Sequence, residues 1–282
     1  MDVKKVAVIG GGTMGNGIVT VFATSGFEVT LIETKQELLD RAIGNISSSL
    51  ERMVKKGTIS EEVKDSALAK IGTTIGVENI DPGIDLAIEA VFENKEVKLS
   101  IFKTLDGILK PDSILASNTS SISITELAPK SRADKFIGMH FMNPVPVMKL
   151  VEIIRGYSTS DATYHLIKDI TLKLGKVPVE VQDYPGFISN RILMPMINEA
   201  IFALMEGVAI KEDIDSVMKL GMAHPMGPLT LADFIGLDVC LAIMEVLYNG
   251  FNDPKYRPCP LLKKMVAAGK LGRKSGEGFY KY

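Results

Sequence analysis

The sequence predicts an α/β fold in which a doubly wound parallel sheet is followed by a second domain made only of helices. From the N-terminus, short β-rich runs alternate with helical patterns, as in "KKVAVIG", "GTMGNGIVTVFATSG" and "EVTLIE". This alternation is typical of βαβ units. After "DYPG", at residues 183–186, the pattern becomes helical throughout. A chain of 282 residues is longer than one hydrophobic core usually supports, so we expect domains at residues 1–185 and 186–282.

The remaining elements of the first domain follow from the local pattern. Further strand-like runs lie near Ile71 and in "IDLAIEAV", "SILASNT", "KFIGMHFM", "LVEIIRG" and "KVPVEVQ". Several of these runs are apolar throughout, which fits strands that are buried on both faces. Between Glu33 and the strand near Ile71, a long charged helical stretch with a turn at "KKGTIS" predicts a helical hairpin inserted into the domain.

The second domain is expected to contain four helical segments. They are "FISNRILMPMINEAIFALMEG", "KEDIDSVMKLG", "LTLADFIGLDVCLAIMEVLYNG" and "PLLKKMVAAG". Glycine commonly ends a helix, and these segments finish at Gly207, Gly221, Gly250 and Gly269. Helices this rich in apolar residues would expose a large apolar surface in a monomer. We therefore expect a homodimer formed through this domain.

Composition and charge exclude several classes of protein. Hydrophobic residues make up 46% and charged residues 23% of the chain, and the formal net charge is −2. Binding to nucleic acid or to a membrane surface would call for a basic surface, so neither is expected. Cys240 and Cys259 form no CxxC motif, which argues against a disulfide framework and a metal site. The chain shows no leader-like start and no apolar run of about 18 residues, so we expect a cytoplasmic protein.

A glycine-rich turn follows the first expected strand. Residues 10–15 read Gly10-Gly11-Gly12-Thr13-Met14-Gly15, which fits G-x-G-x-x-G, and a helix follows directly. Gly10 allows the tight turn, Gly12 lets the backbone approach a pyrophosphate, and Gly15 permits close packing of helix on strand. The helix N-terminus adds N–H donors and a positive dipole. Such a turn can be a turn and nothing more, but the strand before it and the helix after it favour a Rossmann-like dinucleotide site.

Glu33, at the end of the second expected strand, indicates which dinucleotide is bound. A carboxylate at this place can accept hydrogen bonds from the ribose diol of adenosine and would repel a 2′-phosphate. The sequence therefore favours NAD, and NADP is less expected. Lys35 lies close enough to soften the rejection of a phosphate. FAD uses the same fingerprint, but nothing else in the sequence suggests a flavin.

Two titratable residues stand inside apolar runs: His140 in "IGMHFM" and Glu152 in "LVEIIRG". Burying such a group is costly unless it is paired or hydrogen-bonded. The "NPVP" between the runs breaks structure through Pro144 and Pro146, so the two strands can fold near one another. Glu152 would then orient the imidazole of His140, whose other nitrogen could take a proton from a substrate hydroxyl. Beside a nicotinamide, hydride loss from the same carbon would give a ketone.

The alternative is a core histidine bonded to backbone and a glutamate that faces water. Two further segments favour the functional interpretation. "LASNTSSISI" is polar where its strand ends, which is where ligands bind in open α/β sheets, and Asn118, Ser120 and Ser121 could donate hydrogen bonds there. Capping of a helix start would explain the same residues. In "YPGFISNRI", Asn190 lies near the first turn of the helix that opens the second domain, and a domain junction favours use in binding.

Taken together, these stretches resemble the short-chain L-3-hydroxyacyl-CoA dehydrogenase family, and most closely its stand-alone bacterial 3-hydroxybutyryl-CoA dehydrogenases. The match covers the whole chain in the family's order. The stretches that carry it are "VIGGGTMGNGI", "ASNTSSISIT", "IGMHFMNPVPVMKLVEIIRG", "PGFISNRILMPMINEA", "EDIDSVMKLG", "HPMGPLTLADFIGLD" and "LGRKSGEGFY".

The resemblance implies a role for each matching residue. His140 is similar to the family's catalytic base and Glu152 to its paired carboxylate. Ser120 and Asn190 match the polar residues that hold the reacting oxygen. Positions that line the nicotinamide and ribose side, or make further cofactor and active-site contacts, are matched by Glu93, Lys98, Asn118 and Asn143. Without the family, Lys98 reads as a solvated charge on a helix.

The resemblance also gives the inserted hairpin a use. Arg52, Lys55 and Lys56 form a basic cluster at its turn, and coenzyme A carries phosphates that suit a few cations. A lysine-rich exposed helix end would look the same. The family supports Arg52 and Lys56 as coenzyme A contacts, although its members often have Lys where this chain has Arg52. Glu33 likewise replaces an aspartate that is common in relatives.

These observations predict an NAD-dependent enzyme that interconverts L-3-hydroxyacyl-CoA, 3-hydroxybutyryl-CoA in particular, and 3-ketoacyl-CoA. Two alternatives stay open. One is a dehydrogenase of the same lineage that acts on another 3-hydroxy acid, either a sugar acid or a longer or carboxylated acyl-CoA. The other is a non-catalytic NAD-binding protein, against which the intact Ser120, His140, Glu152 and Asn190 speak. Acyl chain length, physiological direction and pathway are not readable from the sequence.

Overall fold

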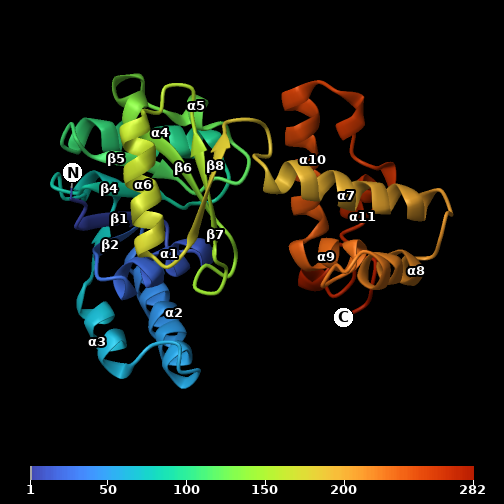
Figure 1. The fold of residues 1–282 in the computed structure, drawn as a ribbon, viewed down its shortest axis with the longest axis horizontal. Helices are drawn as coiled ribbons and strands as arrows, with labels where there is room; N and C mark the ends of the chain where they lie inside the picture. Colours follow the sequence, from blue (N-terminus) through green and yellow to red (C-terminus); the bar gives the residue numbers. More distant parts are fainter. Residues whose placement is uncertain (1) are drawn as a thin grey trace. The chain divides into compact units, whose positions relative to one another are not determined.

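The computed structural model of the protein describes residues 2–282. It confirms the predicted class, because a sheet flanked by helices is followed by a part of the chain that is entirely helical (Figure 1). The chain divides into two compact units, Met1–Asp183 and Tyr184–Tyr282. No helix within the described residues is long and apolar enough to cross a membrane.

The first unit is built on one sheet of eight strands in the order β3-β2-β1-β4-β5-β6-β7-β8. All eight strand-like runs of the sequence are found in it. Their bounds are β1 Lys5–Ile9, β2 Glu28–Glu33, β3 Ile71–Ile75, β4 Leu86–Glu89, β5 Ile114–Ser117, β6 Phe136–Phe141, β7 Leu150–Arg155 and β8 Val177–Gln182. Strands β4, β5 and β6 are buried at every residue, as their continuous apolar character predicts.

The sheet is not parallel throughout, and this corrects the prediction. The strands from β3 to β6 pair in parallel, but β7 runs antiparallel to β6, and β8 is parallel to β7. A parallel connection needs a crossover of a dozen or more residues, whereas residues 142–149 form only a short loop between β6 and β7. The chain therefore turns back as a hairpin at this point.

Helices cover the sheet of the first unit, as Figure 1 shows. They are α1 Thr13–Thr24, α2 Gln36–Lys55, α3 Glu61–Ala69, α4 Lys95–Ile108, α5 Ile124–Leu127 and α6 Asp161–Lys173. The expected hairpin between Glu33 and Ile71 is present as α2 and α3. Helix α2 buries Leu39, Ala42, Ile46 and Leu50, which recur at helical spacing, and these residues join the same hydrophobic core as α1. The opposite face of α2 stays polar.

The second unit has its own apolar core, formed by helices α7 Ser189–Met205, α8 Lys211–Ser216, α9 Pro228–Ile235, α10 Leu237–Phe251 and α11 Pro260–Ala267, with a π-helical turn at Val217–Gly221. The segment predicted as one helix after Pro228 is two helices. Gly236 separates them with a φ of 105°, a backbone conformation that glycine adopts readily. Gly250 also differs from its prediction, because it lies inside α10, and Asn252 ends that helix in the left-handed conformation.

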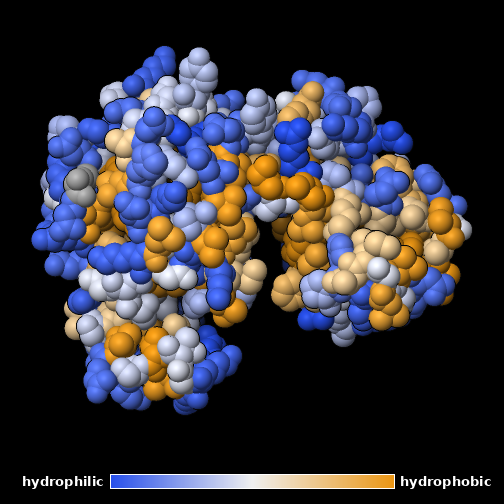
Figure 2. All heavy atoms as spheres, viewed as in Figure 1, coloured by the Kyte–Doolittle hydropathy of each residue, from blue (hydrophilic) through white to orange (hydrophobic). Residues whose placement is uncertain are grey.

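Apolar side chains are exposed on the helical unit. Figure 2 shows them as patches among the polar surface. Leu220 is 85% exposed and Val208 73%, and Ile210, Val217, Met222 and Phe234 are also exposed. A cavity of about 440 Å³ beside Val208 is lined largely by apolar residues of α7, α8 and the π-helical turn. Monomeric proteins seldom expose contiguous apolar surface of this kind.

Candidate active site

The candidate site lies where four parallel strands end. Strands β1, β4, β5 and β6 run in the same direction, so their carboxyl ends meet at one edge of the sheet. The strand order reverses between β1 and β4, since β2 and β3 lie on one side and β5 and β6 on the other. Such a reversal opens the crevice in which doubly wound sheets bind their ligands.

The glycine-rich turn fills the first part of this edge. Gly10 has a φ of 103°, and a Cβ on it would lie 2.9 Å from the carbonyl oxygen of Ala90. A Cβ on Gly15 would overlap the carbonyl oxygen of Gly10. Gly12 is different, because nothing lies within 4 Å of its added Cβ. Two glycines are thus required by the turn itself, and Gly12 leaves open space before the N-terminus of α1, where a pyrophosphate fits.

Glu33 ends β2 beside this turn. Its carboxylate accepts hydrogen bonds from the backbone N–H of Gly11 at 2.6 Å and from that of Thr34 at 3.1 Å. It also lines a cavity of about 560 Å³ together with Gly10, Gly12 and apolar residues such as Ile75 and Val77. This volume lies within the range of small-molecule sites. The adenine ring of a dinucleotide and the ribose diol beside it fit a mostly apolar cavity that has the carboxylate of Glu33 in its wall.

His140 and Glu152 form a buried pair. They lie directly opposite one another in the antiparallel register of β6 and β7, so their side chains point to the same face of the sheet. His140 Nδ1 and Glu152 Oε2 are 2.7 Å apart, and both side chains are almost fully buried. With the carboxylate as acceptor, Nδ1 carries the proton and Nε2 carries the lone pair. This arrangement suits proton abstraction by Nε2.

Asn118 ties three strand ends together. Its backbone N–H donates to the carbonyl oxygen of Glu89 at 2.8 Å, at the end of β4. Its side-chain Oδ1 accepts from the backbone N–H of Phe141 at 2.9 Å, next to His140. The loop after β5 is thereby fixed against β6. Asn118 has a structural function of its own, apart from any contact with a cofactor.

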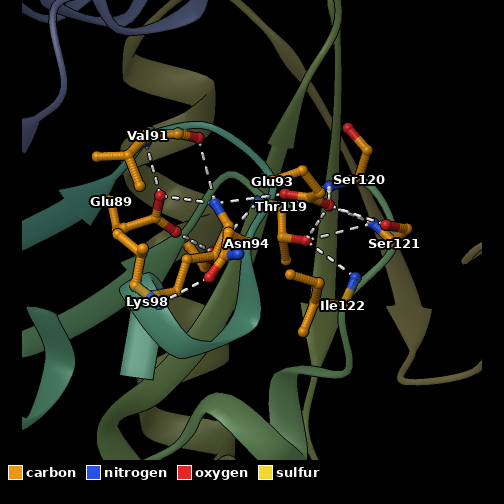
Figure 3. Close-up of polar contacts among 11 residues, drawn as sticks. Glu89, Val91, Glu93, Asn94, Lys98, Thr119, Ser120, Ser121 and Ile122 are labelled. Carbon is orange, nitrogen blue, oxygen red and sulfur yellow. Dashed lines mark hydrogen bonds and ion pairs between the residues drawn. The ribbon is translucent and has the colours of Figure 1, made fainter. Parts of the chain in front are cut away.

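Glu93, Lys98 and Ser120 belong to one polar network (Figure 3). Glu93 Oε1 accepts from the backbone N–H of Ser120 at 3.0 Å, and its Oε2 lies 3.3 Å from the ammonium of Lys98. Burial alone would raise the pKa of Glu93, but the charge of Lys98 and the hydrogen bonds it receives lower the pKa below its usual value. The side chain of Lys98 is 1% exposed, so reading it as a solvated helix charge is wrong.

A second cavity, of about 470 Å³, lies between the start of α1, the polar face of α2 and the loop after β6. Gly12 and Thr13 line it from α1, and Asn143 lines it from the loop. Arg52 lines it from α2, but Lys56 does not. Lys56 caps the C-terminal end of α2 and is exposed. Met14 packs against the hydrophobic core instead of the cavity.

Asn190 belongs to the second unit, where it is buried in the first turn of α7. Several residues at the strand ends were not predicted from the sequence. Glu89, Ser117 and Thr119 are buried there and hydrogen-bond within the network of Glu93 and Lys98. A carboxylate at the end of the apolar run "IDLAIEA" was the available signal for Glu89. No group of His, Cys, Asp and Glu within residues 2–282 is placed to hold a metal ion.

The class of protein is a nicotinamide-dependent dehydrogenase. It is indicated by the glycine-rich dinucleotide-binding turn, the carboxylate at the end of β2 and the buried His–Glu pair at the same sheet edge. Residues 5–184 match the family "3-hydroxyacyl-CoA dehydrogenase, NAD binding domain" and residues 186–282 match its "C-terminal domain". The chain belongs to the 3-hydroxyacyl-CoA dehydrogenase family, and its first unit is an NAD-binding domain.

Individual relatives cover almost the full length of the chain. A "Probable 3-hydroxybutyryl-CoA dehydrogenase" of Deinococcus radiodurans is 59% identical over 279 residues, with 99% of this chain and 100% of that protein covered. A 3-hydroxybutyryl-CoA dehydrogenase of Bradyrhizobium diazoefficiens is 54% identical over 283 residues, covering 99% of this chain and 96% of the relative. The crystal structure of (S)-3-hydroxybutyryl-CoA dehydrogenase from Ralstonia eutropha superposes with a TM-score of 0.97 at 51% identity, and covers 100% of this chain and 99% of the other.

Proposed function

We propose that the protein catalyses the NAD-dependent interconversion of L-3-hydroxybutyryl-CoA and acetoacetyl-CoA. The observation that carries this proposal is the buried His140–Glu152 pair beside a dinucleotide turn at one sheet edge. The substrate class comes from the family and from the C4 substrate named for relatives at 51–59% identity. NAD is the expected cofactor, with NADP disfavoured by the carboxylate of Glu33.

In the proposed reaction, His140 moves one proton between its Nε2 atom and the oxygen of the substrate. In the oxidative direction, Nε2 of His140 takes the proton of the 3-hydroxyl group while hydride leaves the same carbon. Bound NAD supplies the hydride acceptor. The imidazole then carries a positive charge, which the carboxylate of Glu152 stabilises across 2.7 Å. In the reductive direction, His140 returns the proton to the oxygen of the ketone.

The remaining site assignments are proposals that rest on the family. Ser120 and Asn190 hold the reacting oxygen. Glu93 and Lys98 line the nicotinamide and ribose side. Asn118 and Asn143 make further contacts with the cofactor and the active site. Arg52 contacts coenzyme A, and its place on the wall of the cavity of about 470 Å³ supports this. Lys56 is exposed at the end of α2 and does not line this cavity, so its contact with coenzyme A is supported by the family alone.

The test is turnover of acetoacetyl-CoA, followed by the loss of NADH absorbance. We expect NADH oxidation by the wild-type protein, and none would refute the proposed function. His140→Ala is expected to lower kcat by about 10²–10⁴-fold, since this is what a positioned general base contributes. Full turnover by that variant would refute the assignment of the base. Rates with free 3-hydroxy acids and with longer acyl-CoA thioesters separate the C4 thioester from the alternative substrates.

We also propose that the protein is a homodimer formed through its second unit. The exposed Val208, Ile210, Val217 and Leu220, next to the apolar cavity of about 440 Å³, support this interface. Light scattering at micromolar concentration should give twice the mass of the chain. A monomeric mass under these conditions would contradict the proposal.

A further inference from the structure

A carboxylate that no assigned role explains lies at the end of β4. Glu89 is 0% exposed and stands at the sheet edge between the glycine-rich turn after β1 and the loop after β5. A buried carboxylate is costly unless its oxygens are paired and hydrogen-bonded. In Figure 3 its side chain points toward Lys98, on the first turn of α4. Glu89 is therefore a buried carboxylate at the same sheet edge as the candidate active site.

The hydrogen bonds of Glu89 engage both of its oxygens. Oε1 accepts from the ammonium of Lys98 at 2.6 Å and from the backbone N–H of Val91 at 2.7 Å. Oε2 accepts from the hydroxyl of Ser117 at 2.6 Å, at the end of the neighbouring strand β5. Partners from β4, β5 and α4 thus fix the carboxylate in one orientation.

Lys98 connects Glu89 to Glu93. Its ammonium has three hydrogens, and it lies 2.6 Å from Glu89, 3.3 Å from Glu93 and 3.3 Å from the carbonyl oxygen of Val91. Glu89 is the nearest of the three partners. The formal charge of the cluster is −1, because one ammonium is shared by two carboxylates. The position of the ammonium between them depends on both charges.

Glu93 connects the ammonium to the loop after β5. While Oε2 faces Lys98, Oε1 accepts from the hydroxyl groups of Thr119 and Ser121 at 2.6 and 2.9 Å. It also accepts from the backbone N–H groups of Ser120 and Ser121 at 3.0 and 3.1 Å. Four donors of one loop therefore converge on one oxygen. A change in the direction of Glu93 would shift this loop, and Ser120 with it.

We propose that Glu89 is a positioning residue for the dehydrogenase site, acting through Lys98 and Glu93 on the nicotinamide side of the cofactor and on the Ser120 loop. It contacts no reacting atom. Its charge holds Lys98 between two carboxylates and nearer to Glu89, and Lys98 holds Glu93 in the direction that fixes residues 119–121. The inference rests on the proposed function for the roles of Glu93, Lys98 and Ser120.

Glu89→Gln tests the charge with little change of shape. The amide oxygen can still accept from Lys98 and Val91, and the amide nitrogen can donate to Ser117. Of the two carboxylates beside Lys98, only that of Glu93 then remains. We expect the dissociation constant for NADH to rise about tenfold, equivalent to about 1.4 kcal/mol, and kcat to fall as well. Glu126→Gln is the matched control. Glu126 pairs on the exposed surface, at 2.9 Å, with Lys95 of α4, the helix that also carries Lys98. The control should bind NADH as the wild type does.

The measurement is a fluorescence titration of NADH, with circular dichroism and thermal melting as checks of the fold. A folded Glu89→Gln protein with wild-type NADH affinity and kcat, even with a lower Tm, would show a purely structural role and overturn the proposal. If Glu89→Gln does not fold, Ser117→Ala decides, since it removes one hydrogen bond to Glu89. We expect a rise of about twofold to fivefold in its NADH dissociation constant, and an unchanged value in the folded protein refutes the inference. NADH binding needs no acyl substrate, so a wild type that binds NADH but leaves acetoacetyl-CoA unreduced counts against the proposed function alone.

Discussion

Replacement of Glu152 by glutamine removes one charge from the candidate site and almost nothing else. The side chain keeps its length and its place opposite His140 on β7. The contact it changes is the buried hydrogen bond of 2.7 Å between Nδ1 and Oε2, a length typical of charge-assisted bonds. A hydrogen bond to a charged group contributes about 1.5–3 kcal/mol. If the transition state carries the imidazolium, the loss of this bond alone lowers kcat about 10- to 150-fold.

The tautomer of His140 adds a second term. A glutamine can donate to Nδ1, which would move the ring proton to Nε2 and remove the lone pair that accepts the substrate proton. An amide in place of the orienting carboxylate lowers kcat by about 10⁴-fold in the Ser-His-Asp hydrolases, for this reason. We therefore expect Glu152→Gln to lower kcat by about 10²–10⁴-fold, with a smaller change in the KM for NADH, because Gly12 and Glu33 lie at other strand ends.

The assay is the reduction of acetoacetyl-CoA at saturating NADH across a range of pH. Glu180→Gln serves as the control, since Glu180 lies on the adjacent strand β8 in an exposed pair with Arg155. It should turn over as the wild type does. Should folded Glu152→Gln retain the kcat of the wild type, the carboxylate would not orient the base, and the account of the pair given above would be wrong.

Three other expected results follow from the contacts of single residues. Gly15→Ala should abolish folding or NAD binding, because its Cβ overlaps a backbone carbonyl oxygen. Gly12→Ala should fold and weaken NADH binding, because its Cβ enters only the space proposed for the pyrophosphate. Melting curves and NADH titration distinguish the two variants. Glu93 has a lowered pKa in the folded protein, so its stabilising contribution is present above its usual value of 4.5 and lost as the pH falls through the folded value. The free energy of unfolding of Glu93→Gln should therefore fall less on acidification than that of the wild type, and an equal fall would contradict the pKa argument. Arg52→Met should raise the KM for acetoacetyl-CoA about twofold to fivefold and leave the KM of a thioester without the nucleotide unchanged. Lys56→Met should have a smaller effect, since Arg52 lines the cavity and Lys56 does not.

The sequence was informative wherever a local pattern decides the structure. Strand positions follow from short apolar runs. The turn after β1 follows from its glycines, of which Gly10 and Gly15 leave no room for a Cβ. The hairpin of α2 and α3 follows from a long charged helical stretch with a turn at "KKGTIS". These features depend on neighbours in the chain, and local patterns are sufficient to predict them.

Lys98 shows where that reasoning stops. On a helix that begins with "KEVK", a lysine has the pattern of a solvated charge, yet its side chain is buried between Glu89 and Glu93. Glu89 precedes Lys98 by only nine residues, but the helical pattern of α4 does not reveal that the end of β4 lies against this side chain. The same holds for Gly236, whose break between α9 and α10 depends on a backbone angle that the apolar pattern does not reveal.

The reversal of the chain after β6 is what places the proposed base and its carboxylate opposite one another on neighbouring strands. A crossover would have placed β7 parallel to β6, without the register that a short connecting loop fixes. The hairpin instead makes His140 and Glu152 a directly opposed pair, and the turn at Pro144 sets that register. A slip of one residue would turn Glu152 to the other face of the sheet, leaving a buried carboxylate without its partner. The lone antiparallel pairing in the described sheet is therefore the feature that brings two separated polar residues into one hydrogen-bonded pair, as the proposed acid–base role requires.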